Sequence, residues 1–190
     1  MERGFKSRCE NMSVGLRKDL GLTAVDPLLP RQLASYLEVP VISLYEIPDL
    51  DPKDIHQLLE VDPNAWSAIT VSNESGELII TNTQHQGGRP STDIMHELSH
   101  LLLGHEPATM FFIGVEDFAL RGFNKDSEEE ADWLGSSLLL PRSVLVHIQR
   151  THIPDSTVFE TYEVSQRLLE YRNRMTGVKR QFTKRSGSRG

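Results

Sequence analysis

The spacing of apolar residues along the chain predicts several helices. Met12, Leu16 and Leu20 recur at helical spacing before Gly21, so a helix is expected over residues 10–20. Elsewhere prolines mark the boundaries, because proline fits the first turn of a helix but breaks its interior. The further helices expected on these grounds are residues 30–37, 51–59, 127–140 and 141–150, with two short ones beginning near residues 154 and 163.

Three stretches predict β-strands. Residues 66–71 and 77–82 are rich in apolar and β-branched side chains and flank a turn at 73–76, so we expect them to pair as a hairpin. Residues 39–45 form a further expected strand. Between residues 106 and 126 the pattern leaves two alternatives open, since residues 110–113 fit either a short strand or an apolar loop. The rest of that stretch is expected to be a loop bordering a cleft.

Residues 93–105 predict an amphipathic helix with an unusual polar face. With His96 as the origin of a helical wheel of about 100° per residue, His100 lies at about 40° and Glu97 at about 100°. Four apolar side chains occupy the opposite side, namely Ile94, Leu98, Leu101 and Leu102. The helix therefore presents His-Glu-x-x-His on one face and a surface for burial on the other. Its expected N-cap is Ser91 or Thr92.

The His-Glu-x-x-His pattern predicts a metal site. Two imidazoles one turn apart can bind one ion, and a glutamate between them can take a proton from metal-bound water. We therefore predict that His96 and His100 are zinc ligands and that Glu97 is the catalytic base. His105 lies about 180° from His96 on the wheel, so we interpret it as a structural or C-capping residue rather than a ligand.

A catalytic zinc site needs a third protein ligand, and an acidic run in the next predicted helix supplies candidates. Small residues flank Glu128 on the helical wheel, so its face can approach another helix closely. Glu129 and Glu130 point elsewhere, and we interpret them as exposed carboxylates of a first helical turn. Glu128 is therefore the predicted third ligand. Asp132, one turn later, is expected to hydrogen-bond the far nitrogen of a ligating histidine.

Composition narrows the class of protein. A chain of 190 residues fits one compact domain with a small appendage. Its formal net charge of −7 argues against direct nucleic-acid binding, although basic residues crowd the last stretch. The single cysteine, Cys9, suits a reducing compartment, and we interpret it as incidental rather than as a redox or metal-binding thiol. Because no export signal or membrane-spanning run is visible, we expect the protein in the cytoplasm.

In both the His-Glu-x-x-His motif and the downstream acidic motif, the sequence resembles the ImmA/IrrE family of bacterial metallo-endopeptidases. The matching stretches are residues 95–105, with His-Glu-Leu-Ser-His, and residues 128–141, with Glu-Glu-Glu-Ala-Asp. Weaker similarity extends the resemblance from about residue 10 to residue 175. Ser99 departs from the Ala or Gly that the family often has there, a change expected to be neutral. Because the sequence ends soon after the last predicted helices, we expect a short form without the C-terminal sensor domain of some larger members.

The resemblance implies an α+β, zincin-like fold in which a small twisted sheet packs on the motif helix, followed by a C-terminal helical appendage. We assign residues 1–150 to the metallopeptidase domain, 151–176 to the appendage and 177–190 to a basic, disordered tail.

The resemblance also implies a zinc-dependent endopeptidase, with one zinc ion per chain bound by His96, His100 and Glu128 and with Glu97 as base. Manganese or iron would suit the same ligands. The implied partner is a protein substrate, a helix-turn-helix repressor whose cleavage derepresses stress-response or mobile-element genes. The alternative is a zincin-fold regulatory protein that binds a repressor or antitoxin-like partner without cutting it. The oligomeric state is left open.

Two further expectations concern how a peptide would bind. Peptides often add a strand to the edge of a sheet, and the strand at residues 78–82 is our candidate edge. A tetrahedral oxyanion needs a hydrogen-bond donor besides the metal, for which Arg121, His152 and Tyr162 are the candidates.

Overall fold

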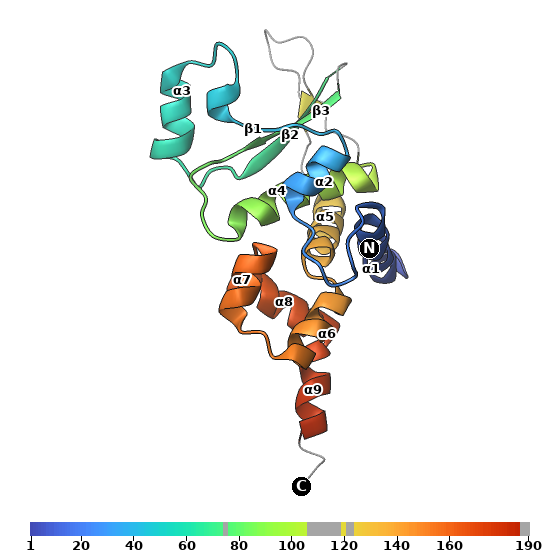
Figure 1. Cartoon of the computed structure of the whole chain (residues 1–190). Coiled ribbons are helices and arrows are strands. Elements are labelled where there is room, and N and C mark those ends of the chain that lie inside the picture. The colour runs from blue at the N-terminus through green and yellow to red at the C-terminus, as the bar shows by residue number, and fades with distance from the viewer. Residues whose placement is uncertain (74–75, 106–118, 121–123, 187–190) are drawn as a thin grey trace.

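The computed structural model of the chain describes residues 1–73, 76–105, 119–120 and 124–186 (Figure 1). The helix α4 (Arg89–Leu103) runs through the middle of the fold, with a small β-sheet on one side and further helices on the other. This arrangement confirms the predicted α+β fold class with a C-terminal helical region. Within the described part of the chain, no helix is long and apolar enough to span a membrane.

The predicted elements are present, with shifted ends. Helix α1 starts at Phe5, earlier than expected, because Phe5 and Cys9 extend its buried face. Residues 110–113 lie outside the described residues. In chain order the other elements are α2 (Pro30–Tyr36), β1 (Val41–Ser43), the 3-10 turn η1 (Leu44–Glu46), α3 (Pro52–His56), the π-helical turn η2 (Gln57–Val61), β2 (Ala68–Asn73), β3 (Gly76–Thr81), β4 (Ala119–Leu120), α5 (Lys125–Leu139), α6 (Arg142–Thr151), α7 (Asp155–Tyr162), α8 (Gln166–Thr176) and α9 (Val178–Ser186).

The sheet has the strand order β1-β3-β2-β4. Strands β2 and β3 pair antiparallel from Ala68↔Thr81 onward, which confirms the predicted hairpin. The expectation that residues 78–82 form an edge strand is wrong, because β1 pairs parallel to β3 on its other side, with Ile42 opposite Ile80. Among the described strands the edges are β1 and β4.

Successive side chains of β3 point to opposite faces of the sheet and are buried in two different hydrophobic cores. Ile79 is fully buried in the main core with α4 and α5, whereas Ile80 lies in a smaller core on the other face of the sheet. That smaller core also contains Leu44 and Leu59 from the segment between β1 and β2. The sheet is therefore held on both faces, and its α4 face is fixed relative to the motif helix.

The start of α4 differs from the prediction. Ser91 and Thr92 do not cap it, since the helix begins at Arg89 with Gly88 as N-cap and proline in its first turn. Instead, Thr92 Oγ1 donates to the Gly88 carbonyl and Ser91 Oγ donates to Glu163 Oε2. The prediction assumed that Pro90 precedes the helix. Proline also fits the first turn of a helix, which is where the structure has it. The shift places Gly88 directly against the backbone ahead of α8.

Replacing Gly88 with alanine should destabilise the fold. A Cβ at this position would lie 2.2 Å from the Val164 carbonyl carbon and 2.3 Å from the Ser165 nitrogen, and neither backbone atom can rotate away. We expect a loss of about 3 kcal/mol in the free energy of unfolding, the upper end for overpacking. Urea denaturation measures it. The control is Gly15→Ala in α1, where no heavy atom lies within 4 Å and helix propensity favours alanine. Equal stability of the two variants would contradict the prediction.

The basic end of the chain is not disordered as far as it is described. Residues Val178–Ser186 form α9, with Val178 fully buried and Phe182 packed on the main core. The prediction of a disordered tail from residue 177 is therefore wrong over this range. Two apolar residues one turn apart anchor the helix. Among so many basic residues, two apolar positions are too short a pattern to predict a helix from the sequence. Arg142 adds hydrogen bonds to the Thr176 carbonyl and Gln181.

Candidate metal centre

Helices α4 and α5 pack closely because small residues face each other at their crossing. A Cβ on Gly135 would lie 3.2 Å from Ser99 Oγ and 3.3 Å from the Met95 carbonyl oxygen. Ser99 is fully buried and donates its hydroxyl back to that same carbonyl. The prediction that small residues let α5 approach α4 is thus confirmed, and a small side chain at 99 suits the contact. This approach brings the first turn of α5 over the polar face of α4.

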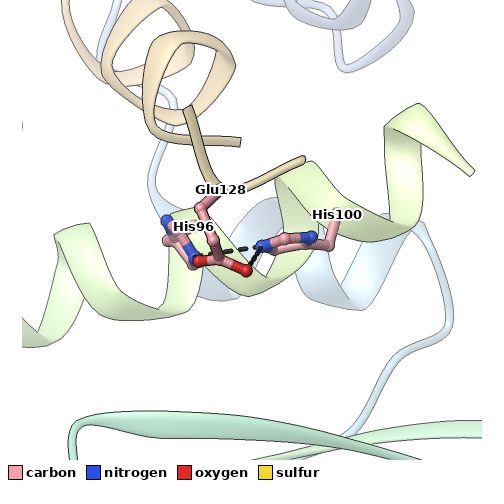
Figure 2. A group of neighbouring side chains, drawn as sticks. All are labelled: His96, His100 and Glu128. Atoms are coloured by element: carbon pink, nitrogen blue, oxygen red, sulfur yellow. Dashed lines mark hydrogen bonds and ion pairs between the residues drawn. The ribbon is translucent and has the colours of Figure 1, made fainter. Parts of the chain in front are cut away.

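Three side chains converge where the two helices meet (Figure 2). His96 and His100 come from α4, and Glu128 comes from α5. Glu128 Oε2 lies 3.1 Å from His96 Nε2, and Glu128 Oε1 lies 3.4 Å from His100 Nε2. The two Nε2 atoms are 3.1 Å apart. The structure therefore brings together the three residues that the sequence selected as ligands.

The contacts between the three side chains, 3.1–3.4 Å with each histidine facing a different oxygen of Glu128, are close to the ligand spacing around a tetrahedral metal ion. Ligands about 2.0–2.1 Å from one zinc ion, at tetrahedral angles, lie about 3.3 Å from each other. Two imidazole nitrogens and one carboxylate are also a ligand set that zinc prefers. The side chain of His100 is 4% exposed, whereas those of His96 and Glu128 are 22% and 29% exposed. The group is thus buried on one side and open on the other, as a site that must admit a substrate requires.

Asp132 contacts His96 from behind. Its Oδ1 lies 2.9 Å from His96 Nδ1, which is the contact that the sequence predicted. Burial alone would lower the pKa of His96, but the hydrogen bond and charge of Asp132, together with the charges of Glu97 and Glu128, raise it above its ordinary value. Asp132 therefore favours an Nδ1–H tautomer, which leaves Nε2 free to bind a metal.

Glu97 is held by the sheet. Thr70 of β2 is 2% exposed, and its hydroxyl donates to Glu97 Oε2 at 2.5 Å. This contact fixes one carboxylate oxygen of the residue between the two histidines. Sequence reasoning missed Thr70, because only the packing of the sheet on α4 reveals which strand residue reaches the motif.

His105 and Glu130 form a second set of contacts behind the site. His105 Nδ1 lies 2.9 Å from His100 Nδ1, and His105 Nε2 lies 3.5 Å from Glu130 Oε2. Glu130 was interpreted as an exposed carboxylate, which is wrong, since its side chain is 22% exposed and faces His105. The helical wheel did not apply to His105, because α4 ends at Leu103 and Gly104 turns the chain back with φ 66°.

A groove of about 1040 Å³ opens beside the candidate ligand His96, between α4, α5 and α8. His96 and Asp132 lie on one wall, and Arg167, Tyr171 and Arg174 of α8 lie on another. A groove of this size can hold several residues of an extended peptide next to His96.

Two of the remaining candidates from the sequence, Tyr162 and His152, make contacts elsewhere. Tyr162 donates its hydroxyl to the Val25 carbonyl, and His152 ends α6 as its C-cap. Arg121 lies outside the described residues. Cys9 is 1% exposed, and burial raises the pKa of its thiol to about 11, so it is a packing residue at neutral pH.

A small sheet on a His-Glu-x-x-His helix, with a downstream glutamate converging on both histidines, defines a zincin-like metallopeptidase domain. The family model described as IrrE N-terminal-like domain, peptidase family M78, matches residues 53–174. The chain belongs to this family. The match begins at α3, so the weaker similarity predicted for the earlier residues stays a prediction. A comparison with curated proteins found no significant match.

Proposed function

We propose that this metallopeptidase is a zinc-dependent endopeptidase in which His96, His100 and Glu128 bind one zinc ion and Glu97 is the catalytic base. The observation that carries the proposal is that the three ligand atoms lie within 4.8 Å of one another. Two of them belong to α4, the helix that also carries Glu97. Zinc, when bound there, would polarise a peptide carbonyl and lower the pKa of a bound water toward about 7.

The chain's own residues supply the proton transfer and the positioning. Glu97 takes the proton of the attacking water and returns it to the leaving amine. The Thr70 hydroxyl, 2.5 Å from Glu97 Oε2, orients the carboxylate by a hydrogen bond. Asp132 holds the ring of His96 through Nδ1. The groove along α8, which His96 and Asp132 line, leaves room for a peptide next to His96.

We further propose that the substrate is a helix-turn-helix repressor in the cytoplasm, cut to derepress stress-response or mobile-element genes. Membership of the IrrE N-terminal-like family supports this substrate class. The groove along α8, about 1040 Å³, is large enough to hold a segment of a protein substrate.

The test is to incubate the purified chain with a co-encoded helix-turn-helix protein, with zinc and with a chelator, and to read the products by mass. We expect one zinc-dependent cut. Stable binding without any cut would support the non-cleaving regulatory alternative instead. Cleavage that a chelator leaves unchanged would contradict the zinc-dependent mechanism.

A further inference from the structure

We infer that His105 and Glu130 act together as positioning residues for the ligand His100; this inference rests on the proposed zinc site. His96 has Asp132 behind it, and His100 has His105 in the corresponding place, at the same 2.9 Å from its Nδ1. The two histidines that face the candidate metal position are thus each held from behind, one by a carboxylate and the other by a second imidazole.

The hydrogen bond between the two histidines and the electrostatic contact of His105 with Glu130 allow one consistent set of protons. A metal bound at His100 Nε2 takes the lone pair of that nitrogen, so Nδ1 of His100 carries the proton and donates it. His105 Nδ1 must then accept, which puts the proton of His105 on Nε2. That nitrogen faces Glu130 Oε2 at 3.5 Å. Glu130 therefore selects the tautomer of His105, and His105 in turn selects the tautomer of His100 that can bind a metal.

Burial makes these contacts effective. The side chains of His100 and His105 are 4% and 13% exposed, and that of Glu130 is 22% exposed, so water competes weakly for their contacts. The backbone holds the pair as well. Gly104 adopts a left-handed conformation at the end of α4, and the His105 N–H donates to the His100 carbonyl at 3.0 Å. The ring of His105 is thereby folded back beside the ring of His100, with centroids 5.0 Å apart.

A second histidine–glutamate pair in the chain provides a matched control. His56 Nδ1 lies 3.0 Å from Glu60 Oε2, but the two side chains are 61% and 60% exposed on α3 and η2, away from the candidate ligands. Changing His56 removes the same kind of contact without touching the site.

The experiment measures the affinity of the full chain for Zn²⁺ by competition with a chromophoric chelator, and the visible absorption of the Co²⁺ form. Removing a hydrogen-bond partner of a metal-binding histidine typically costs about 10–100-fold in metal affinity. We expect that loss for His105→Ala together with a changed Co²⁺ spectrum. His105→Asn, which keeps an acceptor near the position of Nδ1, should recover most of the affinity. Glu130→Gln should show an intermediate loss, and His56→Ala none.

Zinc affinity undiminished in folded His105→Ala and Glu130→Gln variants would overturn the inference alone. A loss in His105→Ala that His105→Asn does not recover would also overturn it, since a missing side chain rather than a missing acceptor would then be the cause. Failure of the unmodified chain to bind zinc would instead overturn the proposed function, and this inference with it.

Discussion

Replacing Glu97 with glutamine should stop peptide cleavage while leaving zinc bound. The amide has nearly the size of the carboxylate and still offers an oxygen to the Thr70 hydroxyl, so the packing of α4 should not change. The three candidate ligands lie on other side chains and keep their positions. An amide cannot accept the proton of the attacking water, however, and the loss of a general base lowers the rate by about 10²–10⁴-fold.

Mass spectrometry of the repressor digest measures the rate, and a metal assay on the same samples measures the zinc content. Glu129→Gln is the matched control, since Glu129 is an exposed glutamate one residue after the ligand Glu128. We expect normal cleavage in that variant. If Glu97→Gln cleaved at the normal rate with zinc bound, Glu97 would not be the base, and the mechanism would need another one.

The ligand set could be predicted from the sequence because it depends on local geometry. An α-helix fixes the angle between residues four positions apart, so one turn of sequence placed His96 and His100 on a common face. The small residues beside Glu128 indicated which face of the next helix could come close, and Gly135 indeed lies against the Met95 carbonyl. No long-range information was needed for either step.

The contacts behind these ligands could not be predicted in the same way. Thr70 reaches Glu97 only because the hairpin packs on α4. The sequence of a strand does not determine which helix packs against its buried face. The pairing of β3 with β1 is likewise a long-range contact, because β1 lies far earlier in the chain. The interaction between His105 and Glu130 depends on where α4 ends, which a wheel drawn through residue 105 ignores.

Two buried arginines are a further feature that hydrophobic patterning cannot reveal. Both bind carbonyls at the C-terminal end of α5: Arg17 Nη2 donates to Leu138 and Arg172 Nε donates to Leu140, each at 2.9 Å. Burial lowers the pKa of Arg17 to about 10, so it remains charged at neutral pH. Cations at this end complement the helix dipole and satisfy carbonyls left without helical partners. They fix one end of the helix whose other end carries Glu128.

Replacing Glu10 with glutamine should destabilise the protein strongly, because Glu10 is the counter-ion of one of these arginines. Arg172 is 0% exposed, and its Nη2 lies 2.5 Å from Glu10 Oε1. Removing one partner leaves a buried charge without compensation, which typically costs about 3–5 kcal/mol. For a chain of this length that corresponds to a fall of about 10 °C in the melting temperature. Thermal unfolding followed by circular dichroism measures it.

The reverse change should cost less, and this asymmetry tests the physical reason. Arg172→Met removes the buried charge and keeps an unbranched apolar side chain, while Glu10 is 28% exposed and still accepts from the Arg142 backbone N–H. We therefore expect Arg172→Met to be more stable than Glu10→Gln, and the double variant to lie close to Arg172→Met alone. Equal losses that simply add in the double variant would show that the two side chains act independently. Glu10 would then not be what allows a charged arginine to stay buried against the end of α5.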